Sequence, residues 1–307
     1  MKVSTSLFFD RSVDQMVGGQ SNLAKTQMRL SSAKNVVNPS DAPNQATAIQ
    51  RLKSVIGRHE SYDKNLQAAN NRLIAEETAL EATNNVLTRI KELAIQGANG
   101  TLGPKDRELV AIEIEGLTND LLALANTQDV NDNYIFSGSR VQVKPYEKNV
   151  VGDIEYSGDE TRNQVQVGEQ RFIRFNRTGT DVFGRVIREN VDGTQTGKGF
   201  FQALTELAEG MRKSDTEAMN VGINDLDQAS FNIALATAQV GTEMSVVETQ
   251  KSVNEETVLQ FKTALSKVED LDYSAAVTEM QKNMLALQAT QSSFSQISNL
   301  SLFNYIR

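Results

Sequence analysis

Two stripes of largely apolar residues, one near each end of the chain, repeat with the spacing of a coiled-coil helix. Successive members are four and three residues apart in alternation, which places their side chains along one narrow seam of an α-helix. The first stripe is Phe9, Val13, Met16, Gln20, Leu23, Gln27 and Leu30, and the second is Tyr273, Val277, Met280, Met284, Leu287, Gln291 and Phe294. We therefore predict a helix at each end of the chain, and we expect the two helices to pack together as one domain.

A comparison of the entropy cost of ordering the helices with the free energy gained by burial indicates that such a helix pair needs further partners. Ordering 30 residues costs roughly 30 to 60 kcal/mol of backbone entropy. Each buried large apolar side chain returns only about 1.5 to 3 kcal/mol, and each stripe holds few of them. Apolar residues also continue to the C-terminus, at Ile297, Leu300, Leu302, Phe303, Tyr305 and Ile306. We therefore expect the ends to be loosely ordered in a free monomer and to be completed by neighbouring subunits.

The expected assembly residues follow from these two stripes. Phe9, Val13, Met16, Leu23 and Leu30 are predicted to face Val277, Met280, Met284, Leu287 and Phe294, and Leu300, Leu302 and Phe303 are predicted to contact neighbouring subunits.

The rest of the chain predicts a nested helical architecture with a small β-rich insert. Apolar stripes predict a helix of about 80 Å from roughly residue 45 to 97, at about 1.5 Å per residue. The glycines and Pro104 after residue 97 predict a reversal into a second helix, and a third long seam runs from Ile223 to Val268. The prolines of residues 35–43 and a register slip at residues 269–272 mark the two joints. For these inner helices we favour the ordinary interior of a monomeric bundle.

Between about residues 138 and 198 the pattern becomes β-prone. Residues 154–156, 165–167 and 171–175 are short strand candidates separated by glycine-containing turns. The predicted fold is mainly α, a long helical bundle or coiled coil formed by both chain ends, with a small β-rich inserted domain. The predicted domains are a terminal coiled-coil assembly domain (1–43 plus 270–307), an inner helical rod (44–137 plus 199–269) and a β-rich outer domain (138–198).

Composition argues against several classes of function. The chain of 307 residues has a net charge of −8 and contains no cysteine. The negative charge disfavours nucleic acid and anionic membrane surfaces as partners, and the missing thiols remove disulfides, thiolate metal sites and thiol catalysis. No apolar run is long enough for a membrane span or for the core of a cleavable signal peptide, so export is expected to use another route.

Candidate chemical motifs are incomplete, and we expect no cofactor, no metal and no catalytic site. Asp129, Asn131 and Asn133 have the spacing of the first three ligands of a calcium-binding loop. Tyr134 and Arg140 occupy the positions where such a loop requires glycine and glutamate, so we interpret the segment as a polar turn. His59 is the single histidine and lies on a helical stripe, where packing is the simpler interpretation. Residues 193–199 resemble a phosphate loop with wrong spacing and are interpreted as a flexible hinge.

Four segments give the chain a family resemblance. They are residues 30–34 (Leu-Ser-Ser-Ala-Lys), 36–43 (Val-Val-Asn-Pro-Ser-Asp-Ala-Pro), 133–138 (Asn-Tyr-Ile-Phe-Ser-Gly) and 301–305 (Ser-Leu-Phe-Asn-Tyr). In these, the chain resembles the hook-filament junction proteins of the bacterial flagellum, within the flagellin superfamily. Flagellin shares the first forty residues in kind, but usually lacks the proline-bracketed segment and ends differently. The small β-rich region matches only in kind, which leaves its role open.

The resemblance implies a structural adaptor without enzymatic activity. It implies a ring of copies between the first hook-associated protein and the flagellin filament, an extracellular location in the flagellum, and export without a cleavable signal, with a dedicated chaperone on the C-terminal helix. A soluble coiled-coil signalling protein, a flagellin-type filament subunit, and an enzyme that uses the β-rich region as a binding site remain as alternatives.

Overall fold

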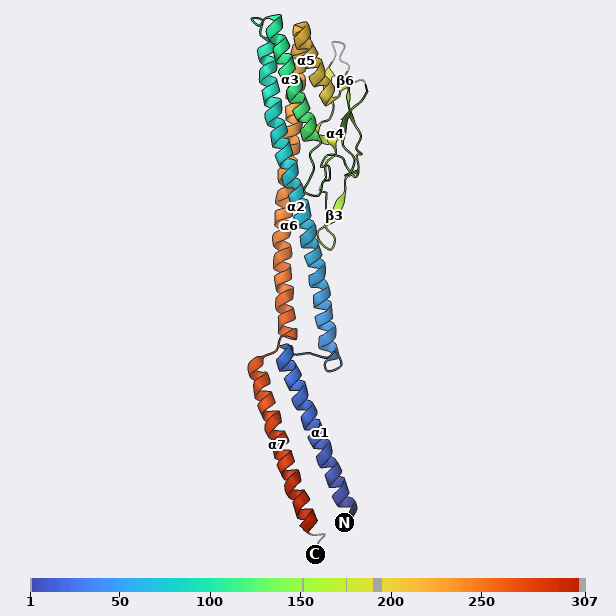
Figure 1. The fold of residues 1–307 in the computed structure, drawn as a ribbon, viewed down its shortest axis with the longest axis vertical. Coiled ribbons are helices and arrows are strands. Elements are labelled where there is room, and N and C mark those ends of the chain that lie inside the picture. Colours follow the sequence, from blue (N-terminus) through green and yellow to red (C-terminus); the bar gives the residue numbers. More distant parts are fainter. Residues whose placement is uncertain (1, 151, 175, 190–194, 304–307) are drawn as a thin grey trace. The chain divides into compact units, whose positions relative to one another are not determined.

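The structure is a computed structural model of the chain (Figure 1). It describes residues 2–150, 152–174, 176–189 and 195–303, and it describes side chains in these ranges except at residues 2–6, 8, 189 and 297–303. The elements, in chain order, are α1 (Lys2–Ser32), α2 (Pro43–Ala98), α3 (Pro104–Ala125), β1 (Tyr146–Lys148), β2 (Ile154–Tyr156), β3 (Gln164–Gln166), β4 (Phe172–Arg174), α4 (Gly179–Val182), β5 (Val186–Glu189), β6 (Gln195–Lys198), α5 (Phe200–Lys213), α6 (Thr216–Glu269) and α7 (Tyr273–Phe303). The prediction of a mainly helical fold with a small strand-containing insert is confirmed.

The chain forms two compact units. The terminal unit consists of Met1–Glu60 and Glu256–Arg307, and the inner unit is Ser61–Glu255. Helices α2 and α6 contribute to both units, because each unit boundary falls inside one of them. The three-domain division expected from the sequence, with joints at residues 43 and 270, stays a prediction.

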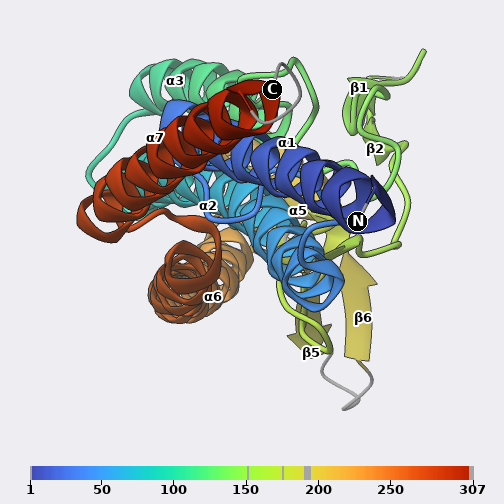
Figure 2. The same ribbon diagram turned by 90° about the horizontal axis from the view of Figure 1, so that it is seen from below.

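In the terminal unit, α1 and α7 run antiparallel and lie side by side over their length (Figures 1 and 2). This confirms the prediction that both chain ends form helices that pack on each other. The joint after α1 and the joint before α7 are linked by backbone hydrogen bonds from Asn35 N to Glu269 O (2.7 Å) and from Leu271 N to Ala33 O (3.1 Å).

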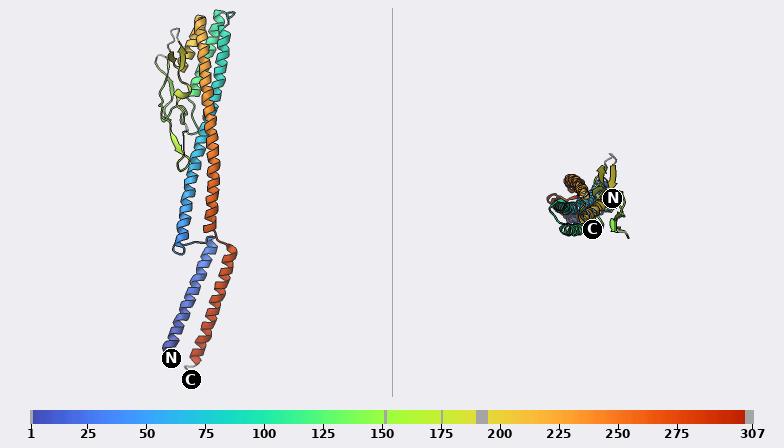
Figure 3. Two further views of the ribbon diagram at one scale, coloured as in Figure 1. Left: turned by 180° about the vertical axis from the view of Figure 1, so that it is seen from behind. Right: turned by 90° about the horizontal axis from the view of Figure 1, so that it is seen from above.

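The inner unit is organised around the seam between α2 and α6 (Figure 3). Within α2, four fully buried leucines recur every seven residues, and α6 supplies a matching heptad series of buried side chains. They are Leu66, Leu73, Leu80 and Leu87 on α2, and Met219, Leu226, Ile233, Val240 and Val247 on α6. A seven-residue repeat of apolar positions is the pattern of coiled-coil packing. The two stripes predicted for these helices therefore form the interior of this unit.

At the end of α2, the chain reverses into α3, which packs against α5. Gly97 of α2 lies directly against α5, since a Cβ atom there would lie 2.4 Å from Sδ of Met211. Helix α5 was not predicted from the sequence. It ends at Ser214, whose φ of 54° is left-handed, and Asp215 then accepts hydrogen bonds from the first backbone N–H groups of α6.

The insert between α3 and α5 holds three two-stranded antiparallel sheets, with strand orders β1-β2, β3-β4 and β5-β6. All three predicted strand segments coincide with β2, β3 and β4 to within one residue at either end. Gly197 pairs with Ile187 within the β5-β6 sheet, so the prediction of a flexible hinge is wrong for residues 195–198, and Gly193 lies outside the described residues. The antiparallel ladder explains the difference, because it fixes the backbone on both strands.

Arginines attach this insert to the helices of the inner unit. Arg72 of α2 donates to the carbonyl oxygen of Ile135 (2.9 Å). Arg177 donates to Oε2 of Glu243 on α6 (2.9 Å), and both arginine side chains are about 95% buried. Fixed, buried charge-assisted hydrogen bonds of this kind set where the insert sits on the helices of this unit.

Candidate assembly site

The contact between α1 and α7 is a heptad seam in which large and small side chains alternate. On α1 the large side chains are Phe9, Met16, Leu23 and Leu30, and the small ones are Ser12, Gly19 and Thr26; on α7 the large ones are Met280, Leu287 and Phe294, and the others are Ala276, Asn283 and Thr290. All are half-buried or buried. Each helix thus repeats one large and one small position per seven residues, which lets the helices approach closely.

Specific contacts fix the register of this seam. The rings of Phe9 and Phe294 meet edge to face with centroids 5.6 Å apart. A Cβ atom at Gly19 would lie 3.3 Å from Cδ1 of Leu287, so the leucine packs against the bare backbone there. Nearer the joint, Nδ2 of Asn283 donates to Oγ1 of Thr26 (3.3 Å), and Thr26 is only 2% exposed.

Of the predicted assembly residues, seven lie on this seam and three do not. Phe9, Met16, Leu23, Leu30, Met280, Leu287 and Phe294 occupy its large positions. Val13, Val277 and Met284 point elsewhere and are 43%, 39% and 44% exposed. The side chains of Leu300, Leu302 and Phe303 lie outside the described residues. Contact of any of these thirteen residues with a neighbouring subunit stays a prediction.

The small seam residues were missed because the prediction ranked positions by apolarity. Apolarity ranks Val13 above Ser12, and the series that follows from Val13 contains Gln20 and Gln27 where the seam has Gly19 and Thr26. A usable signal was present: Ser12, Gly19 and Thr26 recur every seven residues, as do Ala276, Asn283 and Thr290. Small side chains repeated every seven residues allow two packed helices to approach closely, since the distance between helix axes depends on the side chains at the contact.

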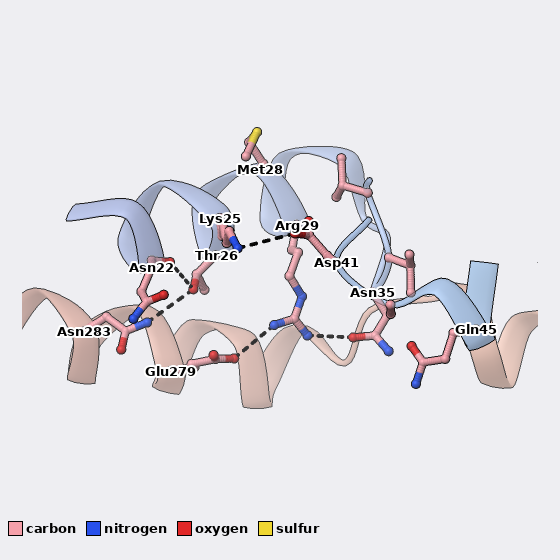
Figure 4. A pocket seen from close by; sticks show the side chains of 13 residues that line it. Asn22, Lys25, Thr26, Met28, Arg29, Asn35, Asp41, Gln45, Glu279 and Asn283 are labelled. Carbon is pink, nitrogen blue, oxygen red and sulfur yellow. Dashed lines mark hydrogen bonds and ion pairs between the residues drawn. The ribbon is translucent and has the colours of Figure 1, made fainter. Parts of the chain in front are cut away.

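A polar pocket of about 520 Å³ lies where α1, the joint after it and α7 meet (Figure 4). Arg29 is its central side chain and donates to Oδ1 of Asn35 (2.6 Å) and to Oε2 of Glu279 (3.2 Å). Lys25 forms an ion pair with Asp41 across the pocket (3.3 Å). These bonds connect the last turn of α1 both to the joint and to α7, so they restrain the direction in which the chain leaves α1.

Glu269, the last residue of α6, links three segments of the terminal unit. Its Oε1 atom lies 3.0 Å from Nζ of Lys34 and 2.8 Å from Nζ of Lys53, and its side chain is 11% exposed. The hydrogen bond from Lys53 lowers the pKa of Glu269 most, and that from Lys34 adds to it, so the carboxylate stays charged at neutral pH. The joint is thereby held by both main-chain and side-chain bonds.

Apolar side chains remain exposed on the other faces of α1 and α7. On α1 these are Leu7 (50% exposed), Val13 (43%), Val17 (59%) and Met28 (42%). On α7 they include Tyr273 (54%) and Leu285 (69%). Surfaces with this many apolar side chains are typical of subunit interfaces.

The other candidate motifs take structural roles. The Asp129 carboxylate accepts hydrogen bonds from the backbone N–H groups of Asn131 and Asn133, which closes a turn. The His59 ring packs against Phe261, with centroids 5.7 Å apart. Among the described residues, no group of three or more His, Asp or Glu side chains is placed to hold a metal ion, and no helix is both long and apolar enough to cross a membrane.

These features define a mainly helical protein in which both chain ends form one helix pair and the middle carries a small β-containing insert. Two family models match this sequence. They are the bacterial flagellin N-terminal helical region, over residues 6–141, and the bacterial flagellin C-terminal helical region, over residues 223–306. The chain belongs to the flagellin family of bacterial flagellar proteins.

Relatives in this family are similar to the chain over most or all of their length. The flagellar hook-associated protein 3 of Salmonella typhimurium is 26% identical over 321 aligned residues that cover 100% of both chains. That of Escherichia coli is also 26% identical, over 99% of each chain. The flagellin of Listeria monocytogenes is 22% identical over 96% of this chain and 95% of its own.

Solved structures agree on the fold. The flagellar hook-associated protein 3 of Legionella pneumophila superposes with a TM-score of 0.65 at 22% identity, covering 72% of this chain and 98% of that one. FlgL of Xanthomonas campestris gives a TM-score of 0.63 at 20% identity, covering 71% and 99%.

Proposed function

We propose that this chain is the structural adaptor that joins the flagellar hook to the flagellin filament. The observation that carries the proposal is the end-to-end similarity to two proteins named flagellar hook-associated protein 3, at higher identity than the Listeria flagellin shows. The paired terminal helices with exposed apolar side chains supply the kind of surface that a subunit of a larger assembly needs.

In this proposal the chain works in the flagellum outside the cell and catalyses no reaction. Copies of the chain form a ring, which contacts the first hook-associated protein on one side and flagellin on the other. Before assembly, an export chaperone covers the apolar C-terminal helix α7. The half-buried seam of α1 and α7 supports this order of events, because a weakly held helix pair opens for export and is completed by neighbouring subunits afterwards.

The test is a deletion of the gene in the source bacterium, followed by electron microscopy of the cells and by immunoblotting of the culture medium. We expect hooks without filaments, with flagellin accumulating unassembled in the medium because its export continues while its attachment site is missing. Complementation with the intact gene restores the filaments.

The same experiment separates the alternatives. If the chain were instead the flagellin of the filament, its deletion would leave hooks without filaments, and no flagellin would appear in the medium. Normal swimming and normal filaments after deletion would overturn the proposal and favour a signalling protein.

A further inference from the structure

One face of α1 combines acidic and apolar side chains and points away from α7. Asp10, Val13, Asp14 and Val17, here called the acidic ridge, lie within about 100° of one another, at about 100° per residue of an α-helix. Both aspartates are exposed, as are the two valines. The seam residues Phe9, Ser12, Met16 and Gly19 lie on the other side of the helix, so packing against α7 leaves the ridge uncovered.

The start of α2 carries a groove with the opposite charge. The groove, of about 780 Å³, is here called the α2 groove, and it is lined by Pro39, Pro43, Ala46, Thr47, Gln50, Arg51, Ser54, Val55 and Arg58. The helical members recur every three or four residues along one face of α2. Ala46, Thr47 and Ser54 have short side chains, which leave the groove open along this face of α2. Pro39 of the joint lines one end of the groove. Among the residues that the structure describes, none with a carboxylate lines this groove.

The α2 groove presents a guanidinium group in the middle of this face. Arg51 is exposed and forms no ion pair with any residue that the structure describes. Arg58 already takes part in an interaction within the chain, so Arg51 is the group assigned to the contact.

We propose that the α2 groove of one copy receives the acidic ridge of a neighbouring copy. Asp10 and Val17 are seven positions apart along α1, about 10 Å, and Thr47 and Arg58 of the groove are about 16 Å apart along α2, at about 1.5 Å per residue. The ridge is therefore shorter than the groove. Val13 and Val17 pack on the short side chains of the groove, and Asp10 and Asp14 flank the guanidinium group of Arg51.

A second copy of the chain is the occupant because both halves of the contact are present on the terminal unit of each molecule. The ridge and the groove are different surfaces, so the contact is heterologous and adds subunits in one direction, which closes into a ring when the rotation between subunits allows it. The proposal rests on the proposed function, and it names the surface that covers the outer face of α1.

The chain contains no cysteine, so any disulfide formed in a cross-linking test must involve the introduced cysteines. Two single variants, Val17→Cys and Thr47→Cys, are expressed together in the deletion strain, and isolated flagella are oxidised. We expect a disulfide-linked band at about twice 33.8 kDa that requires both variants. The matched control replaces Val17→Cys by Gln15→Cys, an exposed position on the opposite face of α1, and is expected to give no band.

A charge exchange tests the same contact without cross-linking. Arg51→Glu alone, and Asp10→Arg with Asp14→Arg, are each expected to reduce the fraction of hooks that carry filaments several-fold, since like charges then face each other. All three changes together in one chain are expected to restore that fraction. Arg171→Glu, an exposed arginine of the inner unit, controls for the altered net charge.

The outcomes distinguish this contact from the proposed function. If the deletion strain is complemented by both cysteine variants but the band is missing, or if the triple variant is as defective as the separate variants combined, the ridge does not dock in the groove while the junction function stands. If Val17→Cys instead cross-links to a cysteine placed on α1 or α7 of a neighbour, another helix covers the ridge and the proposal is wrong. Normal filaments in the deletion strain overturn the proposed function itself.

Discussion

At the scale of single residues, the inner unit holds an ionic cluster under its β-containing insert. Glu76 of α2 is 1% exposed, and its Oε1 atom forms an ion pair with Nε of Arg177 at 2.5 Å. Glu243 of α6 pairs with the same arginine, while Arg72 and Asp129 complete the surrounding charges. Burial raises the pKa of Glu76 to about 7, because the cost of desolvating its carboxylate exceeds the attraction to Arg177.

This pKa predicts a pH dependence of stability with a definite sign. The folded state binds a proton at Glu76 more tightly than the unfolded state does, so the contribution to stability is complete below about pH 4.5 and is lost as pH rises through about 7. Its size is on the order of 3 kcal/mol. We expect the wild-type chain to have a larger unfolding free energy at pH 5.5 than at pH 8 because of this group, as measured by urea denaturation. The difference between the two pH values is expected to be smaller in Glu76→Gln.

The matched control for this prediction is Glu81→Gln, an exposed residue of the same helix. Glutamine keeps an oxygen acceptor for Arg177 at position 76, so the variant is expected to fold. If Glu76→Gln retains the whole pH dependence of the wild-type chain, the titrating group lies elsewhere in the molecule.

At the scale of elements, the pairing of α1 with α7 depends on complementary size more than on apolarity. Leu287 packs over Gly19, where the partner helix offers no side chain, and Phe9 meets Phe294 at the other end of the seam. Most of the seam side chains are half-buried, so each contributes less than a core side chain does.

A buried charge in this seam is expected to separate the two helices. Leu287→Asp removes the leucine packing and places a carboxylate against α1, at a cost of about 2 kcal/mol or more. We expect faster amide hydrogen exchange in α1 and α7, unchanged exchange in the heptad core of α2 and α6, and loss of filament attachment in the complemented deletion strain.

Leu285→Asp is the matched control, because it adds the same charge two residues away at a side chain that is 69% exposed. Its hydrogen exchange in α1 is expected to equal that of the wild-type chain. Equal exchange in the two variants, or normal swimming of the Leu287→Asp strain, would show that the seam does not hold the helices together.

At the scale of the whole molecule, burial is divided unequally between the two units. The large side chains that are fully buried, among those described, all lie in the inner unit, from Leu66 to Val247. In the terminal unit, only Thr26 and Ala276 of the described seam residues are buried. Local stability follows buried contacts, so the terminal unit is expected to open first.

Limited proteolysis of the dilute monomer tests this order. We expect trypsin to cut within α1, α7 and the joint after α1 well before it cuts the inner unit, leaving a resistant fragment near Ser61–Glu255 that mass spectrometry identifies. Assembled flagella are expected to protect the same sites. Termini that resist trypsin in the monomer as long as the inner unit does would contradict the proposed completion of the terminal helices by neighbours.

The sequence by itself determined the helices with strong repeats and the joints between them. The stripe from residue 45 to 97 matches α2, and the one from 223 to 268 lies within α6. The slip at residues 269–272 begins at the last residue of α6 and ends just before α7. Apolar periodicity and prolines act locally, so they are readable without knowledge of the partners. Helix α5 lies in the segment 199–269 that is assigned to the helical rod, but the sequence analysis names no separate helix there, because the apolar series it follows begins only at Ile223, although Phe201, Leu204 and Leu207 recur at helical spacing.

Only the tertiary structure decided which face of each terminal helix meets the other. Val13 and Ser12 are equally compatible with a helix, and the preference for Ser12, Gly19 and Thr26 in the seam arises from the space that Leu287 and its neighbours on α7 require. The small-residue heptad of α1 is visible in the sequence, but its match to α7 involves two segments more than 250 residues apart, so neither segment alone decides which of the two heptads of α1 forms the seam. The same choice leaves the acidic ridge of α1 facing outward.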